Sequence, residues 1–270
     1  MSFVSIDKAC FSYQQTQLTL DAIDWQIERG DIHCLVGRSG CGKTTLLKLA
    51  AGLLLPDSGS VCINGNRVAR PDQTIGFVFQ SPNLLEWLSV LENVLLPISL
   101  QRKPNSADIG KAQQQLVLVG LSNFHARYPR ELSGGQQSRV AIARALITEP
   151  LVLLMDEPFA ALDALTREEL QDDLLKLCEN QKTTVLFVTH DIAEAIYLAD
   201  RIAVMDSGQV RHQFDINLPR PRQHEIRFGV EFNALCQDAR TAMLGHSSVN
   251  APATLADPIS ETAKQESMSA

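Results

Sequence analysis

The chain has 270 residues, 45% of them hydrophobic and 20% charged. This composition is that of a folded globular protein and excludes a wholly disordered or collagen-like polymer. The length predicts one large α/β domain or two interleaved subdomains. Asp and Glu outnumber Lys and Arg by 31 to 24, for a net charge of −7. This is the wrong sign for a protein whose main partner is a nucleic acid.

Membrane and disulfide signals are weak in this sequence. Its apolar runs are strand-length, far from the roughly 18 to 20 residues that a membrane-spanning helix needs. The first ten residues lack the apolar segment of a secretory signal. The six cysteines are spread along the chain without a C-x-x-C pair, which favours reduced thiols over disulfides or a zinc site. We therefore expect a cytoplasmic protein.

Strands alternate with helices in the first 80 residues, which we assign to the first part of a core. Short strands are predicted at 32–36, 61–63 and 75–79, and a helix at 44–51. Residues 81–150 differ, because prolines and helical spacing of apolar residues predict a mostly helical insert there.

The second part of the core is predicted to span residues 151–215. It begins with an apolar strand at 151–156 and continues with a helix at 166–178 and a fully apolar strand at 183–190, as in a buried parallel sheet. A helix at 192–199 and a strand that ends at a Ser207-Gly208 turn complete it. Residues 216–270 form a C-terminal extension, whose tail from about 245 is rich in Ser, Ala and Thr and is predicted to be disordered.

A glycine-rich motif follows the first predicted core strand and precedes a predicted helix. Its pattern, G-x-x-x-x-G-K-[ST], is formed by Gly37, Arg38, Ser39, Gly40, Cys41, Gly42, Lys43 and Thr44, and Thr45 follows. Glycines of this kind let backbone N–H groups turn towards a phosphate at the positive end of the helix. Lys43 is expected to reach the β- and γ-phosphates, and the Thr44 hydroxyl to ligate magnesium. The motif predicts a nucleotide phosphate site.

Two further motifs carry chemistry. The strand at 151–156 ends in Asp156 and Glu157, so one carboxylate can hold magnesium while the other faces an attacking water. The run Leu132-Ser133-Gly134-Gly135-Gln136 precedes a clear helix and predicts a second anion site at a helix N-terminus. Each motif alone also fits a plainer interpretation, a surface acidic pair or a capping serine.

Together these motifs resemble the nucleotide-binding subunit of ATP-binding-cassette transporters, for which LSGGQ is the distinguishing signature. The resemblance covers about residues 3 to 215. It implies a P-loop NTPase, RecA-like α/β core with a small antiparallel β part and a helical subdomain insert. It also implies ATP and Mg²⁺ as ligands, and hydrolysis of ATP.

The resemblance also implies roles for residues outside the motifs. Tyr13 matches the aromatic residue that stacks on adenine, Gln80 matches the glutamine that touches magnesium and the attacking water, and His190 matches the histidine that holds the γ-phosphate. Asp163 matches the loop that crosses the dimer, although Ala160 stands where many relatives have serine. Glu157 is the expected general base. Plain surface or capping residues remain the alternatives for Tyr13, Gln80 and His190.

Relatives pair head to tail, so that the phosphate loop of one copy and the LSGGQ segment of the other hold one nucleotide. The implied partners are a second ATPase subunit, an integral-membrane permease and, indirectly, a solute-binding protein, with the chain peripheral on the cytoplasmic side of the membrane. Residues 81–97, with Trp87, are the expected docking site for the permease. A buried helix face is the alternative for Trp87.

Residues 77–97 together with 189–205 and 218–222 are similar to the ATPase subunits of nitrate, sulfonate and taurine importers. Glu86 replaces a proline that is common in relatives. Alternatives are an importer of an unrelated solute and a soluble cassette ATPase acting on DNA or ribosomes. The 90 positions between Lys43 and Ser133 leave no room for the coiled coil such soluble proteins carry. A P-loop kinase or GTPase leaves LSGGQ and His190 without a role.

Overall fold

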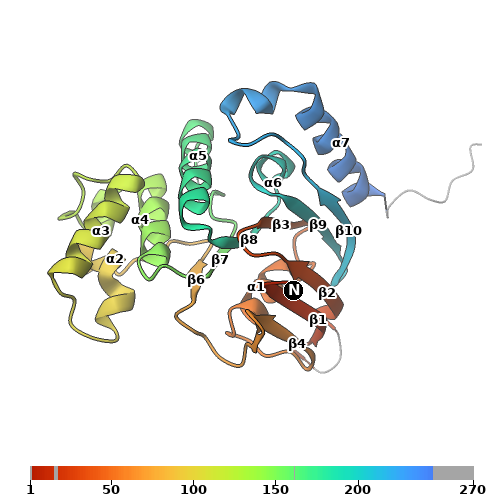
Figure 1. Ribbon diagram of the computed structural model, residues 1–270, viewed down its shortest axis with the longest axis horizontal. Helices are drawn as coiled ribbons and strands as arrows, with labels where there is room; N and C mark the ends of the chain where they lie inside the picture. The colour runs from red at the N-terminus through yellow and green to blue at the C-terminus, as the bar shows by residue number, and fades with distance from the viewer. Residues whose placement is uncertain (1, 15–17, 161, 246–270) are drawn as a thin grey trace, which may run out of the picture.

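The computed structural model describes residues 2–14, 18–160 and 162–245 (Figure 1). A six-stranded sheet with the order β10-β9-β3-β8-β7-β6 forms its centre. All neighbouring pairs in this sheet are parallel except β10 with β9. In sheet order the strands are β10 (Gln209–Asp215), β9 (Arg201–Asp206), β3 (Ile32–Gly37), β8 (Thr184–Thr189), β7 (Val152–Asp156) and β6 (Ile75–Val78).

A smaller antiparallel sheet packs beside the central one and has the order β2-β1-β4-β5. Its buried apolar side chains share a core with helix α1 (Lys43–Ala50) and with the side chains on one face of the central strands. This sheet supplies the small antiparallel β part expected from the resemblance. Its strands are β1 (Val4–Phe11), β2 (Leu20–Ile27), β4 (Ser58–Ile63) and β5 (Asn66–Arg67).

The other face of the central sheet is covered by helices. Helix α6 (Ile192–Leu198) packs on β3 and β8, and α7 (Val230–Leu244) packs on α6 and β9. Every residue of β3, β7 and β8 is buried, because helices or strands cover both faces. This confirms the buried parallel strands predicted from the continuous apolar runs.

Three helices form a group at one end of the molecule (Figure 1): α2 (Val90–Ser99), α3 (Ser106–Leu118) and α4 (Gly134–Leu146). Each begins at a capping box, in which a Ser or Asn side chain accepts from the third helical N–H and the residue there reaches back. The group reaches the central sheet where α4 contacts β6. Residues 81–89, inside the predicted helical insert, precede α2 and are not helical.

The C-terminal extension holds structure that the sequence pattern did not indicate. A short 3-10 helix, η2 (His224–Phe228), is followed by the four turns of α7. Only Phe232 and Ala239 of α7 are buried, so its apolar periodicity is too sparse to be read from the sequence. Helix α5 (Ala164–Gln181) is also longer than predicted. The tail beyond residue 245 lies outside the described residues.

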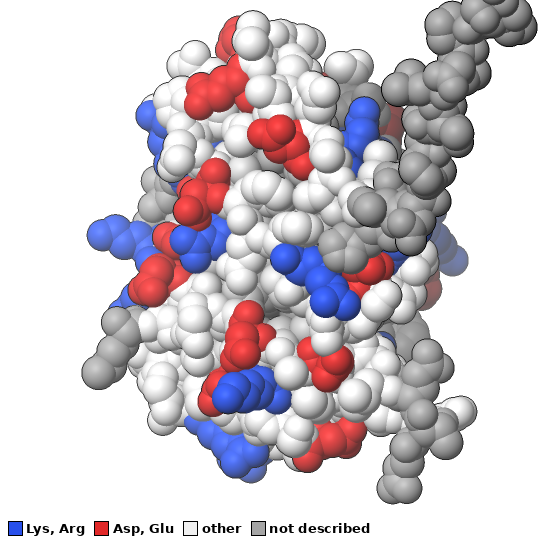
Figure 2. Space-filling view, turned by 90° about the vertical axis from the view of Figure 1, so that its right-hand side faces the viewer, with Lys and Arg blue, Asp and Glu red and all other residues white. Residues whose placement is uncertain are grey.

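The face in Figure 2 carries acidic and basic side chains interspersed, without a broad patch of one sign. A nucleic-acid-binding face would gather Lys and Arg. No helix in the described part of the chain combines the length and apolar character of a bilayer span.

His33 gives the fold a pH dependence that can be measured. Its side chain is 2% exposed on β3, and its ring lies 5.8 Å from that of Trp25. Burial, helped by the positive charge of Arg201, lowers the pKa of His33 from 6.5 to about 4. Between pH 6.5 and pH 4 the unfolded chain therefore binds a proton at His33 that the folded chain does not bind. The free energy of unfolding is highest above pH 6.5 and decreases as the pH falls towards 4.

We expect the His33→Gln variant to lose less stability than the parent chain between pH 7 and pH 5, by about 2 kcal/mol at a slope of about 1.4 kcal/mol per pH unit. Urea unfolding at the two pH values measures this difference. The exposed His125→Gln variant is the control and should behave as the parent chain. Equal pH dependence in all three proteins would contradict a suppressed His33 pKa.

Candidate active site

The phosphate loop and the predicted residues Gln80, Asp156, Glu157 and His190 lie where four adjacent parallel strands end. β3 leads into the phosphate loop, β7 ends at Asp156, β8 is followed by His190, and Gln80 lies two residues beyond β6. Because parallel strands present their carboxyl ends at one edge, the topology brings these segments together. Ligands bind at this edge in open α/β sheets.

The phosphate loop has a closely packed shape that requires glycine at two positions. Gly42, at the N-cap of α1, has a φ of 105°, a conformation open to glycine. A Cβ on Gly37 would lie 2.3 Å from the carbonyl oxygen of Met205, so this position also requires glycine. Lys43 is 6% exposed, and its Nζ donates to the carbonyl oxygens of Gly37 and Arg38, each at 2.8 Å. A buried ammonium on neutral acceptors suits an anionic ligand.

Tyr13 lies beside the start of α1. Its hydroxyl is 3.3 Å from Oγ1 of Thr45, and its side chain is 58% exposed. A cavity of about 430 Å³ extends from Tyr13 to Gly40 of the phosphate loop. An exposed aromatic ring at the wall of such a cavity suits stacking on a base. Within the loop, Arg38, Ser39 and Gly40 are exposed, whereas Cys41 is buried.

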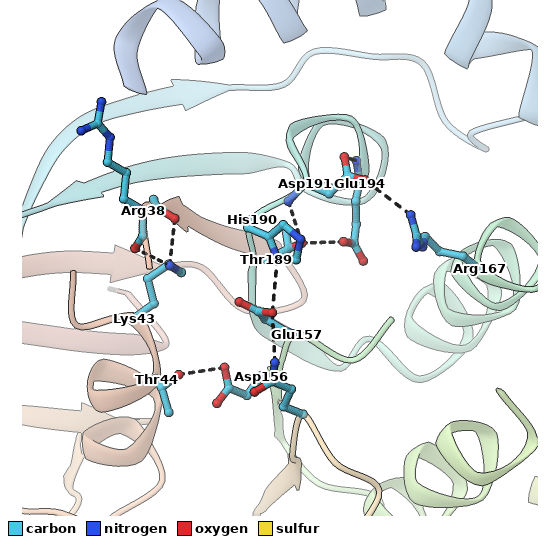
Figure 3. A network of polar contacts seen from close by, with 12 residues as sticks. Arg38, Lys43, Thr44, Asp156, Glu157, Arg167, Thr189, His190, Asp191 and Glu194 are labelled. Atoms are coloured by element: carbon cyan, nitrogen blue, oxygen red, sulfur yellow. Dashed lines mark hydrogen bonds and ion pairs between the residues drawn. The ribbon is translucent and has the colours of Figure 1, made fainter. Parts of the chain in front are cut away.

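Thr44 and Asp156 form the oxygen pair expected of a magnesium site (Figure 3). The Thr44 hydroxyl donates to Oδ1 of Asp156 at 3.1 Å. Asp156 is 7% exposed, and burial raises its pKa. In the described residues, no three His, Cys, Asp or Glu side chains cluster into a metal site. Magnesium is typically held by one or two protein oxygens together with substrate phosphates, so the pair fits this ion.

Glu157 joins the two polar residues expected to act with it. Its Oε2 lies 3.2 Å from Nδ1 of His190 and accepts from Nε2 of Gln80 at 3.3 Å. The backbone of Glu157 has a φ of 45°, and its N–H donates to the carbonyl of Val188. This unusual conformation turns Glu157 out of the buried strand towards His190 (Figure 3).

The LSGGQ segment lies in a different packing environment. Ser133 is exposed and caps α4, where its Oγ accepts from the N–H of Gln136 at 3.3 Å. Gly134 is exposed and Gly135 packs against Thr166 at the start of α5. Asp163 is exposed and caps α5 through Thr166. The phosphate loop instead packs against Leu20 and Met205. The residues predicted for one nucleotide site thus pack against different elements of the chain.

Sequence reasoning missed two buried residues behind His190. Thr189 ends β8, and Glu194 lies in the first turn of α6 with 6% exposure. The spacing of Asp191 and Glu194 in the sequence is that of an ordinary helix start. The burial of Glu194 depends on how α6 packs on β3 and β8, which no local pattern reveals.

The strand order, the glycine loop and the carboxylates at the sheet edge define a phosphate-loop nucleotide-binding protein. The chain matches the model of the ABC transporter family over residues 20–160. An aliphatic sulfonates import ATP-binding protein, SsuB, from Bacillus cereus is 47% identical over 224 residues, which are 81% of this chain and 88% of the relative.

Two solved structures are similar to the fold. The dimeric ATP-binding cassette MJ0796, in a post-hydrolysis state bound to ADP and Pi, has a TM-score of 0.72 and 33% identity, covering 80% of this chain and all of that one. The cbiO1 protein from Clostridium perfringens, part of the ABC transporter complex cbiONQ, has a TM-score of 0.75 and 27% identity. The match covers 91% of this chain and 98% of cbiO1. The chain belongs to the ABC transporter family, as one of its ATP-hydrolysing cassettes.

Proposed function

We propose that this chain is the ATPase subunit of an importer for a small organic anion of the aliphatic sulfonate type, acting through a separate permease on the cytoplasmic side of the membrane. The observation that carries the proposal is the high similarity to a sulfonate import protein along most of both chains. The geometry at the ends of the strands supports ATP hydrolysis by this chain, because a phosphate-binding loop lies there together with a carboxylate beside a histidine.

Each site residue has a proposed task in hydrolysis. Lys43 and the loop from Gly37 to Thr45 would bind the phosphates, with Tyr13 against the adenine. Thr44, Asp156 and Gln80 would hold magnesium, which when bound supplies neutralisation of phosphate charge. Glu157 would take a proton from the attacking water, and His190 would orient Glu157 and contact the γ-phosphate.

The proposed working unit is a pair of copies. The segment of Ser133, Gly134, Gly135 and Gln136 packs against other elements than the phosphate loop does, and Ser133 and Gly134 are exposed, as a contact with a second copy requires. The similar cassette MJ0796 is a dimer. Asp163 would lie at the same interface, because its helix starts against Gly135. Two composite nucleotide sites would then form by twofold symmetry.

Trp87 is the proposed anchor for the permease. Its side chain is 73% exposed in the irregular segment before α2, so it is not part of a buried helix face. A large exposed aromatic residue is typical of the energetic centre of a protein interface. The similar protein cbiO1 is part of a transporter complex, which supports assembly with membrane subunits.

We expect Trp87→Ala to reduce co-purification with the permease by about tenfold, the scale of a lost aromatic anchor, and to leave the ATPase rate of the isolated chain unchanged. Val230→Ala, at an 89% exposed apolar position on α7, is the matched control. Retention of full permease binding by Trp87→Ala would reject this docking site.

The solute is tested in vesicles that contain the permease, this chain and the candidate solute-binding protein. ATP-driven uptake of an alkanesulfonate supports the proposal. Uptake of nitrate or bicarbonate instead, with no uptake of a sulfonate, would overturn the proposed solute class. Absence of any transport together with ATPase activity in the isolated chain would favour a soluble cassette ATPase.

A further inference from the structure

A buried carboxyl group lies directly behind the turn that carries His190. Oε2 of Glu194, on α6, accepts a hydrogen bond from the Thr189 hydroxyl at 2.5 Å, and both residues are buried. Thr189 immediately precedes His190 in the chain. Figure 3 shows Glu157 on one side of this turn and Glu194 on the other.

The Thr189 hydroxyl holds the backbone after His190 as well. It accepts from the N–H of Asp191 at 3.1 Å, while Oδ1 of Asp191 caps α6 by accepting from the N–H groups of Ala193 and Glu194. One hydroxyl therefore ties the residues on either side of His190 to the carboxyl of Glu194. The hydroxyl donates its one proton to the Glu194 carboxylate and accepts from Asp191 with an oxygen lone pair, and its bond to an ionised carboxylate is roughly twice as strong as a bond to a neutral acceptor.

The groups that face Glu194 come from several elements. Asp191 lies at the start of its own helix, the Cys34 thiol faces it from β3, and Arg167 and Gln171 face it from α5. The amide oxygen of Gln171 accepts from Arg227 at 2.6 Å, which leaves the NH₂ group of Gln171 for Glu194. Oε1 of Glu194 has no hydrogen-bond partner among the described residues.

These surroundings bring the pKa of the Glu194 carboxyl into the physiological pH range. Burial raises the pKa of Glu194 from 4.5 to about 7, and the nearby charge of Asp191 acts in the same direction. The Thr189 hydroxyl, Arg167 and Gln171 act in the opposite direction, because they favour the ionised form. Both forms of this carboxyl are therefore populated near neutral pH.

We propose that Glu194 is a positioning residue for His190: its carboxylate accepts from Thr189 and holds the turn that presents His190 to Glu157, and its neutral form releases that turn. The neutral carboxyl no longer offers Thr189 a charged acceptor, so the hydrogen bond that fixes the turn weakens or reverses its direction. The proton is taken from and returned to solvent. The inference rests on the proposed role of His190 in hydrolysis.

Histidine NMR of the nucleotide-free chain tests the coupling without any turnover. We expect the His190 resonances, assigned by their loss in His190→Ala, to show a pH step near 7 that comes from Glu194. Glu194→Gln keeps an acceptor for Thr189 but cannot ionise, so this step should vanish. Glu231→Gln, at an exposed carboxylate of α7, is the control and should keep it. An identical His190 titration in Glu194→Gln would overturn the proposal.

The ATPase rate gives an independent readout. A carboxyl with a pKa near 7 changes its ionised fraction about tenfold between pH 6 and pH 8. The rate of Glu194→Gln relative to the parent chain should therefore fall about tenfold between pH 6 and pH 8, because only the parent chain loses its active form in acid. A ratio that stays constant with pH would overturn the proposal.

A second pair of variants covers the case in which Glu194→Gln fails to fold. Thr189→Val removes the hydroxyl and should lower kcat about tenfold with KM nearly unchanged and without the pH step in His190, whereas Thr189→Ser should restore both. Wild-type behaviour of Thr189→Val would overturn the proposal. Suppose instead that His190→Ala hydrolyses ATP at the full rate while the parent chain shows the pH step in its His190 resonances. That result would reject the role of His190 in hydrolysis and leave its coupling to Glu194 in place.

Discussion

Replacing Glu157 with Gln is expected to lower ATP hydrolysis by about a hundredfold, the scale of a lost general base, while ATP binding persists. The carboxylate lies between His190 at 3.2 Å and Gln80 at 3.3 Å. Glutamine fits the same space and can keep one of these contacts, but it cannot accept a proton from water. The reaction should stop after ATP is bound, so the paired form that hydrolysis would separate should accumulate.

Single-turnover phosphate release measures the loss, and size-exclusion chromatography with ATP detects the trapped pair. Glu149→Gln serves as the control, because Glu149 is exposed and pairs with Lys111 rather than with a site residue. Undiminished phosphate release by Glu157→Gln would remove Glu157 from the mechanism. Equal loss in both variants would point to a general effect on folding.

The parts of the fold that sequence patterns predict are those with strong local signals. The apolar runs at 151–156 and 183–190 mark buried parallel strands because both faces of β7 and β8 are covered. The phosphate loop can be predicted because its glycines stand at a fixed local spacing, and Gly42 is required by its own φ of 105°. Gly37 is required by the close approach of Met205, which the motif does not reveal.

The arrangement of the site depends on strand order, which a single sequence does not encode locally. Gln80, Glu157 and His190 come together because β6, β7 and β8 are neighbours, a fact that periodicity cannot supply. The resemblance to a known family supplied Gln80 and His190, whereas Glu157 was predicted from its place at the end of an apolar strand. Glu194 had no such signal: its spacing from Asp191 is that of a helix start, and it is buried because α6 packs on β3 and β8 with side chains of α5 nearby.

Mixing two damaged variants tests whether one nucleotide site is built from two chains. Lys43→Ala removes the buried ammonium of the phosphate loop, and Ser133→Glu places a negative charge at the exposed N-terminus of α4. Each variant alone should lose nearly all ATPase activity, by about a hundredfold, because every site would lack one of its two halves. An intact fold, checked by circular dichroism, is required of both.

A mixed pair behaves differently if the site spans two chains. The phosphate loop of the Ser133→Glu copy then meets the signature segment of the Lys43→Ala copy, and both of these are intact. Half of the pairs in an equal mixture are mixed, and each has one good site of two, so activity should return to about a quarter of the parent level. If Lys43 and Ser133 served a site within one chain, no combination of the two variants would contain an intact site, and mixing would restore nothing.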